Sequence, residues 1–248
     1  MRLKLVSCEI VYREMCALAA RSRNQVDVEF LPKGLHDIGS TRMRTRLQQA
    51  VDAADSGQYE AVLLGYALCG NGLVGLRART LPLVLPRAHD CITFFMGSKE
   101  RYLEYFTSNS GVYFRTTGWL ERGNAVGQLS VESLGGLDPK YEELVKKYGE
   151  DNARYLYEQI GQYVHNYRQL TFIEMGIEPD GSFEQRSREE AARRGWAFEK
   201  LAGDLSLLQS LTDGDWDNER FLVVKPGQRI VARYDSAIIA AEDCHDEP

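Results

Sequence analysis

The feature that most constrains the fold is a regular alternation of short apolar runs with helix-forming segments over the first 120 residues. The runs are rich in Val, Leu and Ile and predict strands, whereas the segments between them repeat apolar residues every three to four positions, as amphipathic helices do. Strands that alternate with helices typically form a parallel sheet. The pattern therefore predicts an α/β fold with a Rossmann-like, mostly parallel sheet and helices on both faces.

The elements expected from these patterns fall into two sets. Strands are predicted at 3–9, 26–32, 59–66, 81–86, 111–116, 169–176 and 197–203, with a strand pair in 220–234. Helices are predicted at 10–22, 40–57, 97–109, 187–196 and 204–214, with a helical insertion around 138–168. We expect a single α/β domain over 1–234, with two lobes (1–120 and 121–234) as the alternative. The tail, 235–248, is acidic and is expected to be frayed.

Charge and hydropathy exclude several classes of protein. The net charge is −6, which argues against a nucleic-acid-binding surface over the whole molecule. No apolar run approaches the roughly 18 residues that a membrane span needs, and no secretory signal is recognisable. A cytoplasmic protein with a small-molecule substrate is expected, and a homo-oligomer is one option. The five cysteines then suggest free thiols, metal ligands or redox groups rather than a disulfide framework.

Three of these cysteines occupy the same kind of position in the predicted sheet. Cys8 ends the first strand, Cys69 follows the third and Cys91 follows the fourth, while His36 follows the second. The carboxyl ends of parallel strands lie along one edge, where ligands bind, so these side chains are expected to form one site. Packing as small hydrophobic residues is the alternative for each cysteine taken singly. It is the favoured interpretation for Cys16, and Cys244 is expected to be unstructured.

Several kinds of chemistry fit such a site. Soft thiolates bind an iron–sulfur cluster or zinc, so the predicted metal ligands are Cys8, Cys69 and Cys91, with His36 or His89 as a fourth ligand. His89, Asp90 and Glu9 are the candidate acid–base or catalytic residues. The metal-free alternative is a nucleophilic Cys69 or Cys91 with a histidine as its base. A helix that follows the cysteine would lower the pKa of its thiol and favour this chemistry.

A glycine-rich stretch follows Cys69 directly. Gly70-Asn71-Gly72-Leu73-Val74-Gly75 matches G-x-G-x-x-G in letters, but a dinucleotide-binding loop needs its first glycine at the strand end and an acidic residue at the end of the next strand. Both requirements fail here. We therefore assign Gly70, Asn71 and Gly72 to close approach of the backbone to a bound cofactor or metal. Arg77, Arg79 and Arg87 could assist an acidic substrate, although a solvated helix face is the favoured interpretation.

Five sequence blocks carry a resemblance to a known family: "SCEIVYRE", "FLPKGLHD", "GYALCGNGLVGL", "PRAHDCITFFMGSKERY" and "GWAFEKLAGDLSLLQSLTDGDWDNERFLVVKPGQ". Together they resemble the DUF1638 proteins of anaerobic bacteria and methanogenic archaea, over most of the chain up to about Arg233. The resemblance supplies no reaction. It implies oxygen-sensitive metal chemistry and an association with corrinoid-dependent methyltransferases.

Three functions remain open at this point. The first is a metal-dependent protein or enzyme in which the Cys/His site acts on a small molecule, by Lewis-acid chemistry or by activating water or a thiol. The second is a carrier that holds a corrinoid, pterin or metal for a methyltransferase partner. The third is a metal-free cysteine transferase.

Overall fold

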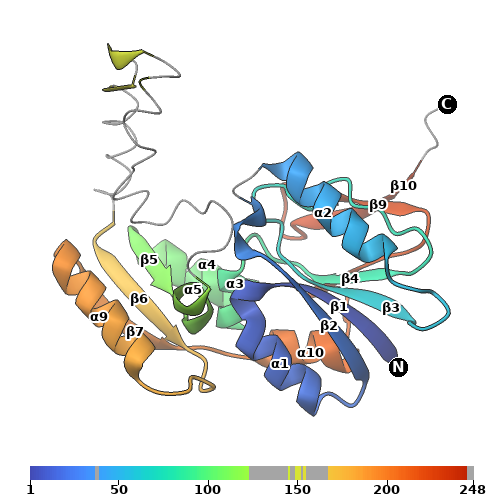
Figure 1. Ribbon diagram of the computed structural model, residues 1–248, viewed down its shortest axis with the longest axis horizontal. Coiled ribbons are helices and arrows are strands. Elements are labelled where there is room, and N and C mark those ends of the chain that lie inside the picture. The colour runs from blue at the N-terminus through green and yellow to red at the C-terminus, as the bar shows by residue number, and fades with distance from the viewer. Residues whose placement is uncertain (37–38, 123–144, 146–148, 152, 155–166, 245–248) are drawn as a thin grey trace.

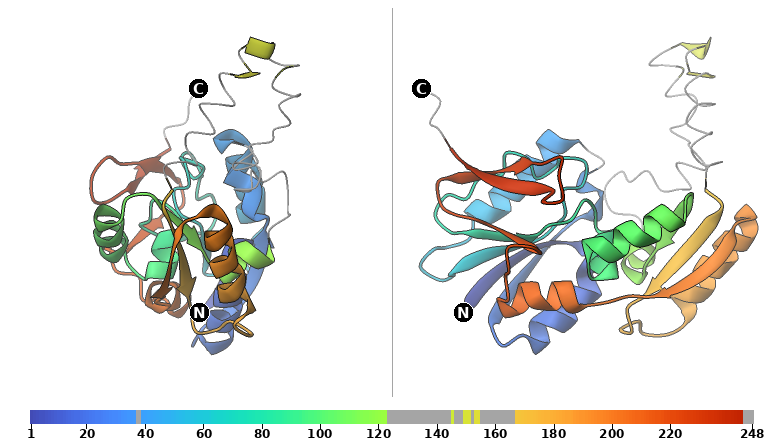
Figure 2. Two further views of the ribbon diagram at one scale, coloured as in Figure 1. Left: turned by 90° about the vertical axis from the view of Figure 1, so that its left-hand side faces the viewer. Right: turned by 180° about the vertical axis from the view of Figure 1, so that it is seen from behind.

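The computed structural model describes residues 1–36, 39–122, 145, 149–151, 153–154 and 167–244. These residues form a five-stranded sheet in the order β2-β1-β3-β4-β8, a three-stranded sheet in the order β5-β6-β7, and a hairpin of β9 and β10. The two larger sheets lie side by side along the long axis (Figures 1 and 2). The predicted α/β class with mostly parallel sheets is confirmed.

The five-stranded sheet is covered on both faces. Its strands are β1 (Arg2–Cys8), β2 (Gln25–Leu31), β3 (Ala61–Gly65), β4 (Leu83–Pro86) and β8 (Phe221–Val224). The first four are parallel, and β8 is antiparallel to β4. Side chains alternate between the faces, so that Leu63 enters one hydrophobic core while Val62 and Leu64 enter the other. All five residues of β3 are therefore buried, as an inner strand covered on both sides requires.

Each face of this sheet has its own cover. After η1 (Glu9–Val11), α1 (Tyr12–Arg21) packs on one face with α10 (Ser206–Asp213). The other face is covered by α2 (Ser40–Asp52) and by the hairpin of β9 (Gln228–Ala232) and β10 (Ile239–Asp243). Figures 1 and 2 show these two covering layers on opposite sides of the sheet. A short η2 (Lys33–His36) links β2 to α2.

The three-stranded sheet is parallel throughout. It consists of β5 (Val112–Arg115), β6 (Gln169–Glu174) and β7 (Ala197–Ala202), with α9 (Ser182–Arg194) against β6 and β7. Ahead of it in the chain come α3 (Ile92–Met96) and α4 (Lys99–Ser108), and α5 (Thr117–Glu121) follows β5. Figure 1 shows α3 and α5 between the two sheets. Because β8 returns to the first sheet, the five-stranded sheet is built from two separate stretches of chain, whereas β5, β6 and β7 follow one another in the sequence.

Some expectations are wrong. The tail is not frayed over residues 239–243, because β10 pairs with β9 there, and the Cys244 amide donates to the Gly227 carbonyl at 2.8 Å. The strands β8 and β9, expected as a pair, pair with other strands. Cys16 is exposed rather than packed in the core.

Two further expectations concern helices. The predicted insertion around 138–168 falls outside the described residues, except for the few positions given above. No helix in the described ranges combines the length and the apolar character that a membrane span requires.

Candidate cysteine pocket

A cavity of about 340 Å³ lies at the carboxyl edge of the five-stranded sheet. Its walls come from the ends of β1 and β3, from the loops after β2, β3 and β4, and from α2, α3 and α5. The lining residues are Cys8, Ile10, Lys33, Met43, Gly65, Tyr66, Ala67, Cys69, Gly70, Asp90, Cys91, Ile92, Phe94 and Trp119. We call this cavity the cysteine pocket.

The pocket brings together three thiols from neighbouring strand ends. Cys8 is the last residue of β1, Cys69 lies in the loop after β3, and Cys91 immediately precedes α3. Since β1, β3 and β4 are adjacent and parallel, their carboxyl ends reach the same edge, where open α/β sheets bind ligands. All three side chains are partly buried.

The backbone around Cys69 has an uncommon conformation. Cys69, Gly70 and Asn71 have φ angles of 45°, 63° and 69°, in the left-handed region that residues other than glycine seldom occupy. The Cys69 amide donates to the His89 carbonyl at 3.0 Å, which ties this loop to the loop that carries Cys91. Strained residues of this kind persist only where the surroundings hold them, and they cluster at functional sites.

Burial dominates the electrostatics of the three thiols. Burial raises the pKa of Cys8 to about 12, with a further rise from nearby Cys69 and an opposing effect of Lys33. Burial and the charge of Asp90 raise the pKa of Cys69 to about 12. The pKa of Cys91 is raised well above its ordinary range, again chiefly by burial and then by Cys69. The net effect on the pKa of Cys91 is thus a rise, opposite to the lowering that the metal-free hypothesis requires.

A buried lysine faces the same cavity. Lys33 is only 2% exposed, and its Nζ donates to the Trp119 carbonyl at 2.9 Å and lies 4.6 Å from the centre of the Trp119 ring. A lysine is seldom buried without compensating partners. Its ammonium group brings positive charge to a cavity that also contains three thiols and the Asp90 carboxyl.

Tyr66 contributes a hydroxyl group to the pocket, and this hydroxyl has no hydrogen-bond partner among the described residues. Its hydroxyl is buried and makes no hydrogen bond to any described residue, and burial, then Cys8 and Cys69, raise its pKa well above the usual range. Buried polar atoms are nearly always hydrogen-bonded. An orphaned hydroxyl beside the thiols is therefore what a site for a bound group with hydrogen-bond acceptors would contain.

The candidate acid–base residues lie in different surroundings. Asp90 lines the pocket, but its Oδ1 accepts from the Ile92 amide at 2.9 Å and its Oδ2 accepts from the Tyr102 hydroxyl at 2.8 Å. His89 is exposed and is not a lining residue. Glu9 accepts from the Lys33 amide through Oε1 at 3.2 Å and lies outside the lining. Asp90 and Glu9 thus hold the loops in place.

The residues of the glycine-rich stretch and His36 also differ in whether they reach the pocket. Gly70 lines the pocket, and a Cβ built there would meet no atom within 4 Å. Asn71 is exposed, and Gly72 instead makes room for the thioether of Met43, which would lie 2.2 Å from a Cβ. The backbone of His36 ends η2, but its side chain lies outside the described part of the structure.

The described residues contain no preformed metal site. Among the described residues, no three His, Cys, Asp or Glu side chains are arranged to hold one metal ion. Thiolates that share one tetrahedral zinc ion would lie about 3.8 Å apart, given Zn–S bonds of about 2.3 Å. The three thiols thus share a cavity without the tight grouping that a single ion requires.

Comparison with known proteins gives a family but no activity. Residues 30–212, more than half of the chain, match the family model described as "Protein of unknown function (DUF1638)". The match includes Cys69 and Cys91 but begins after Cys8, and it is narrower than the resemblance noted in the sequence. Neither the curated proteins nor the solved structures contain a match to this chain. The chain therefore belongs to the DUF1638 family.

Proposed function

We propose that this is a metal-dependent protein in which Cys8, Cys69 and Cys91 hold an iron–sulfur cluster, with a small molecule bound beside it. The observation that carries the proposal is the convergence of three thiols and the orphaned Tyr66 hydroxyl on one cavity. The volume of about 340 Å³ is at the small end of the range for small-molecule sites.

A cluster is proposed because three cysteines share one cavity, and soft thiolates suit iron–sulfur clusters. In a cluster each thiolate would bind a different iron atom. Three cysteines would leave one iron of a four-iron cluster open to a substrate, where it would act as a Lewis acid.

The other lining residues suit the same site. Lys33 would balance the negative charge of the thiolates, since opposite charges in a low-dielectric pocket attract strongly. Tyr66 would donate its hydroxyl proton in a hydrogen bond to the bound group or substrate. The rings of Phe94 and Trp119 form an apolar wall that limits access of water.

A metal-free cysteine nucleophile is less well supported. Such an enzyme needs a thiolate near neutral pH, whereas burial raises the pKa of all three pocket thiols. A soft metal ion would displace the thiol protons and compensate the buried charge. A reducing compartment such as the cytoplasm would keep the thiols available for this.

The proposal is tested by metal retention after anaerobic purification and reconstitution with iron and sulfide. We expect Cys69→Ser to lose most of the bound iron, while Cys16→Ser, which changes an exposed cysteine, retains it. Metal-free wild-type and Cys69→Ser proteins should unfold at similar temperatures, which separates loss of a ligand from loss of fold. Equal iron content in the two variants would contradict the proposal.

A further inference from the structure

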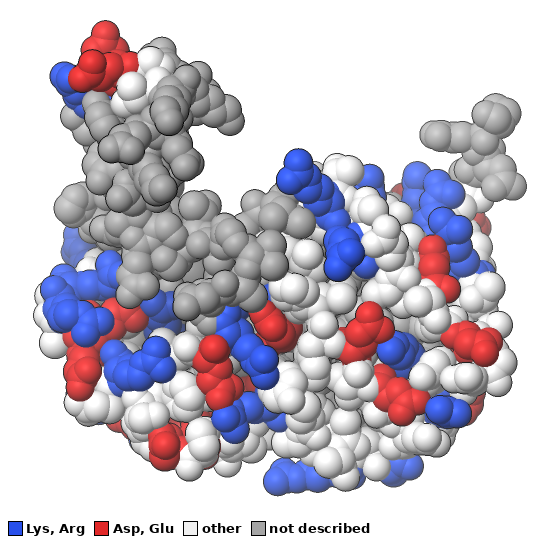
Figure 3. All heavy atoms as spheres, viewed as in Figure 1, with Lys and Arg blue, Asp and Glu red and all other residues white. Residues whose placement is uncertain are grey.

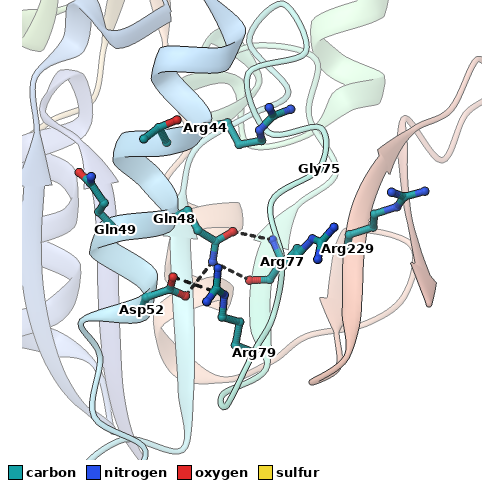
Figure 4. Close-up of a pocket in the computed structure, with 9 residues that line it drawn as sticks. Arg44, Gln48, Gln49, Asp52, Gly75, Arg77, Arg79 and Arg229 are labelled. Carbon is teal, nitrogen blue, oxygen red and sulfur yellow. Dashed lines mark hydrogen bonds and ion pairs between the residues drawn. The ribbon is translucent and has the colours of Figure 1, made fainter. Parts of the chain in front are cut away.

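A second cavity, of about 560 Å³, lies on the side of the five-stranded sheet that is covered by α2 and the β9–β10 hairpin. Four arginines line it: Arg44 from α2, Arg77 and Arg79 from the chain between β3 and β4, and Arg229 from β9. Figure 4 shows these three segments side by side, with Arg77 between Gln48 and Arg229. We call this cavity the arginine pocket.

The chain that carries Arg77 is held on both sides. The side chain of Gln48 donates to the Arg77 carbonyl at 3.1 Å and accepts from the Arg77 amide at 2.9 Å (Figure 4). On the other side the backbone of Arg77 forms an isolated antiparallel β-bridge with the backbone of Arg229. The Gly75 amide also donates to the Ile230 carbonyl at 2.8 Å. These bonds fix the backbone, so the arginines are presented from a preorganised frame, which favours binding. The solvated helix face expected for Arg77, Arg79 and Arg87 is wrong, because none of the three lies in a helix.

The positive charge of the arginine pocket is only partly balanced. Arg79 lies 3.4 Å from Asp52 and Arg229 lies 3.7 Å from Glu242. Both pairs are too long for good hydrogen bonds and are solvent-exposed, so each contributes little. Arg44 donates to the Val74 carbonyl at 3.3 Å. The guanidinium of Arg77 makes no hydrogen bond or ion pair to any residue in the described ranges.

Four arginines around one hollow repel each other unless an anion lies between them. Two carboxylates are close to them, Asp52 and Glu242, which leaves an excess of two positive charges in a protein of net charge −6. Core packing does not account for this concentration of positive charge, because the side chains of Arg77, Arg79 and Arg229 are all exposed to solvent.

We propose that the arginine pocket binds a soluble small molecule that carries phosphate groups. Guanidinium groups present a planar set of donors that matches phosphate oxygens in paired hydrogen bonds, and several arginines suit more than one anionic group. The volume is within the range of small-molecule sites. An extended nucleic acid is disfavoured, because the net charge is −6 and both acidic and basic side chains lie on the face shown in Figure 3.

The proposal is tested by isothermal titration calorimetry with inorganic pyrophosphate at low ionic strength. We expect saturable binding that weakens as salt is added, because salt screens exposed charges. Arg77→Gln should weaken binding roughly tenfold, since a hydrogen bond to a charged group is worth about one such factor. The double variant Arg44→Gln, Arg77→Gln should weaken it further. The Arg77 side chain is exposed and that of Arg44 makes one long hydrogen bond, to the Val74 carbonyl, so the variants should remain folded, which circular dichroism checks.

The matched control is Arg193→Gln, which removes an exposed arginine from α9 on the other sheet. It should bind pyrophosphate as the wild type does. Equal weakening by Arg193→Gln would show a general charge effect and overturn the proposal, as would an absence of pyrophosphate binding. Tighter binding of a single-stranded oligonucleotide than of pyrophosphate would overturn it in favour of a nucleic-acid surface.

Discussion

At the scale of single residues, the three pocket cysteines differ from the exposed Cys16 in their surroundings. Cys8, Cys69 and Cys91 are partly buried around a cavity, and burial raises their pKa values. A protonated thiol is a poor nucleophile. The same burial that makes these thiols unreactive therefore leaves them suited to a soft metal, which binds them in the deprotonated form.

Alkylation of the metal-free protein should show this difference. With iodoacetamide at pH 8, followed by peptide mass spectrometry, we expect Cys16 to react first and the three pocket cysteines to react slower by an order of magnitude or more. Their rates should rise with pH, because deprotonation is limiting. Modification of Cys69 as fast as that of Cys16 would contradict the burial described here.

Glu14 gives a second prediction, on stability. Its side chain in α1 is 1% exposed, neither carboxyl oxygen has a partner in the described structure, and burial, with the charges of Glu178 and Glu121, raises its pKa from 4.5 to about 7. A raised carboxyl pKa means that the folded state binds the proton more tightly than the unfolded state does. The contribution of Glu14 to stability is therefore fully present below about pH 4.5 and falls by about 3 kcal/mol as pH rises to about 7.

The variant Glu14→Gln should remove this pH dependence and be more stable than the wild type at pH 8, by about 1 to 3 kcal/mol. Urea unfolding at pH 5 and pH 8 measures both effects. Glu104→Gln, which changes an exposed residue of α4, is the control and should leave the pH dependence unchanged. An unaltered pH dependence in Glu14→Gln would contradict the assignment to Glu14.

At the scale of elements, the local pattern predicts strands and helices better than it predicts their partners. Continuous apolar runs mark β3 and β4, because burial on both faces needs apolar residues at every position, whereas in β1 the run is interrupted by Lys4. β4 pairs with β8, which lies more than 130 residues later in the chain. The local spacing of apolar residues predicts that each segment is a strand but does not show which strand it pairs with. The sequence does not predict β10, because Ile238 and Ile239 are followed by an acidic stretch, which is typical of a frayed tail.

The three-stranded sheet depends on an ion pair that links β5 to α9. Arg115 donates two hydrogen bonds of 2.9 Å to Glu190, and the two side chains are 11% and 8% exposed. Arg194 adds a contact to the same carboxylate at 3.2 Å. Glu190→Gln would remove the negative charge that Arg115 and Arg194 share at this site and should destabilise the protein by about 3 kcal/mol. Glu189→Gln, on the exposed side of α9, should change stability by less than about 0.5 kcal/mol in the same urea unfolding measurement.

At the scale of the whole molecule, the two pockets share two segments of chain. α2 contributes Met43 to the cysteine pocket and Arg44 to the arginine pocket, and the chain after β3 contributes Cys69 to the first and Arg77 to the second. The sequence predicts the cysteine side of this arrangement, because strand ends share an edge. It does not predict Lys33 or Tyr66, since a single lysine or tyrosine in a sequence gives no sign that its polar atom is buried.

The shared segments predict coupling between the pockets. If pyrophosphate binds the arginine pocket, it should reduce hydrogen exchange in peptides that span 66–80, because a ligand that binds the folded state stabilises the region it contacts. Peptides from α9 should be unaffected, and Arg77→Gln should abolish the protection. Protection confined to other regions of the chain would contradict the coupling.

The central claim, that the cysteine pocket holds an iron–sulfur cluster, is tested most directly by the metal and sulfide content of wild-type protein that has never been exposed to air. Elemental mass spectrometry and an acid-labile sulfide assay should find iron and sulfide in comparable amounts, several of each per chain. Stoichiometric zinc without sulfide would contradict the cluster, and protein without any bound metal would contradict a metal site in this pocket.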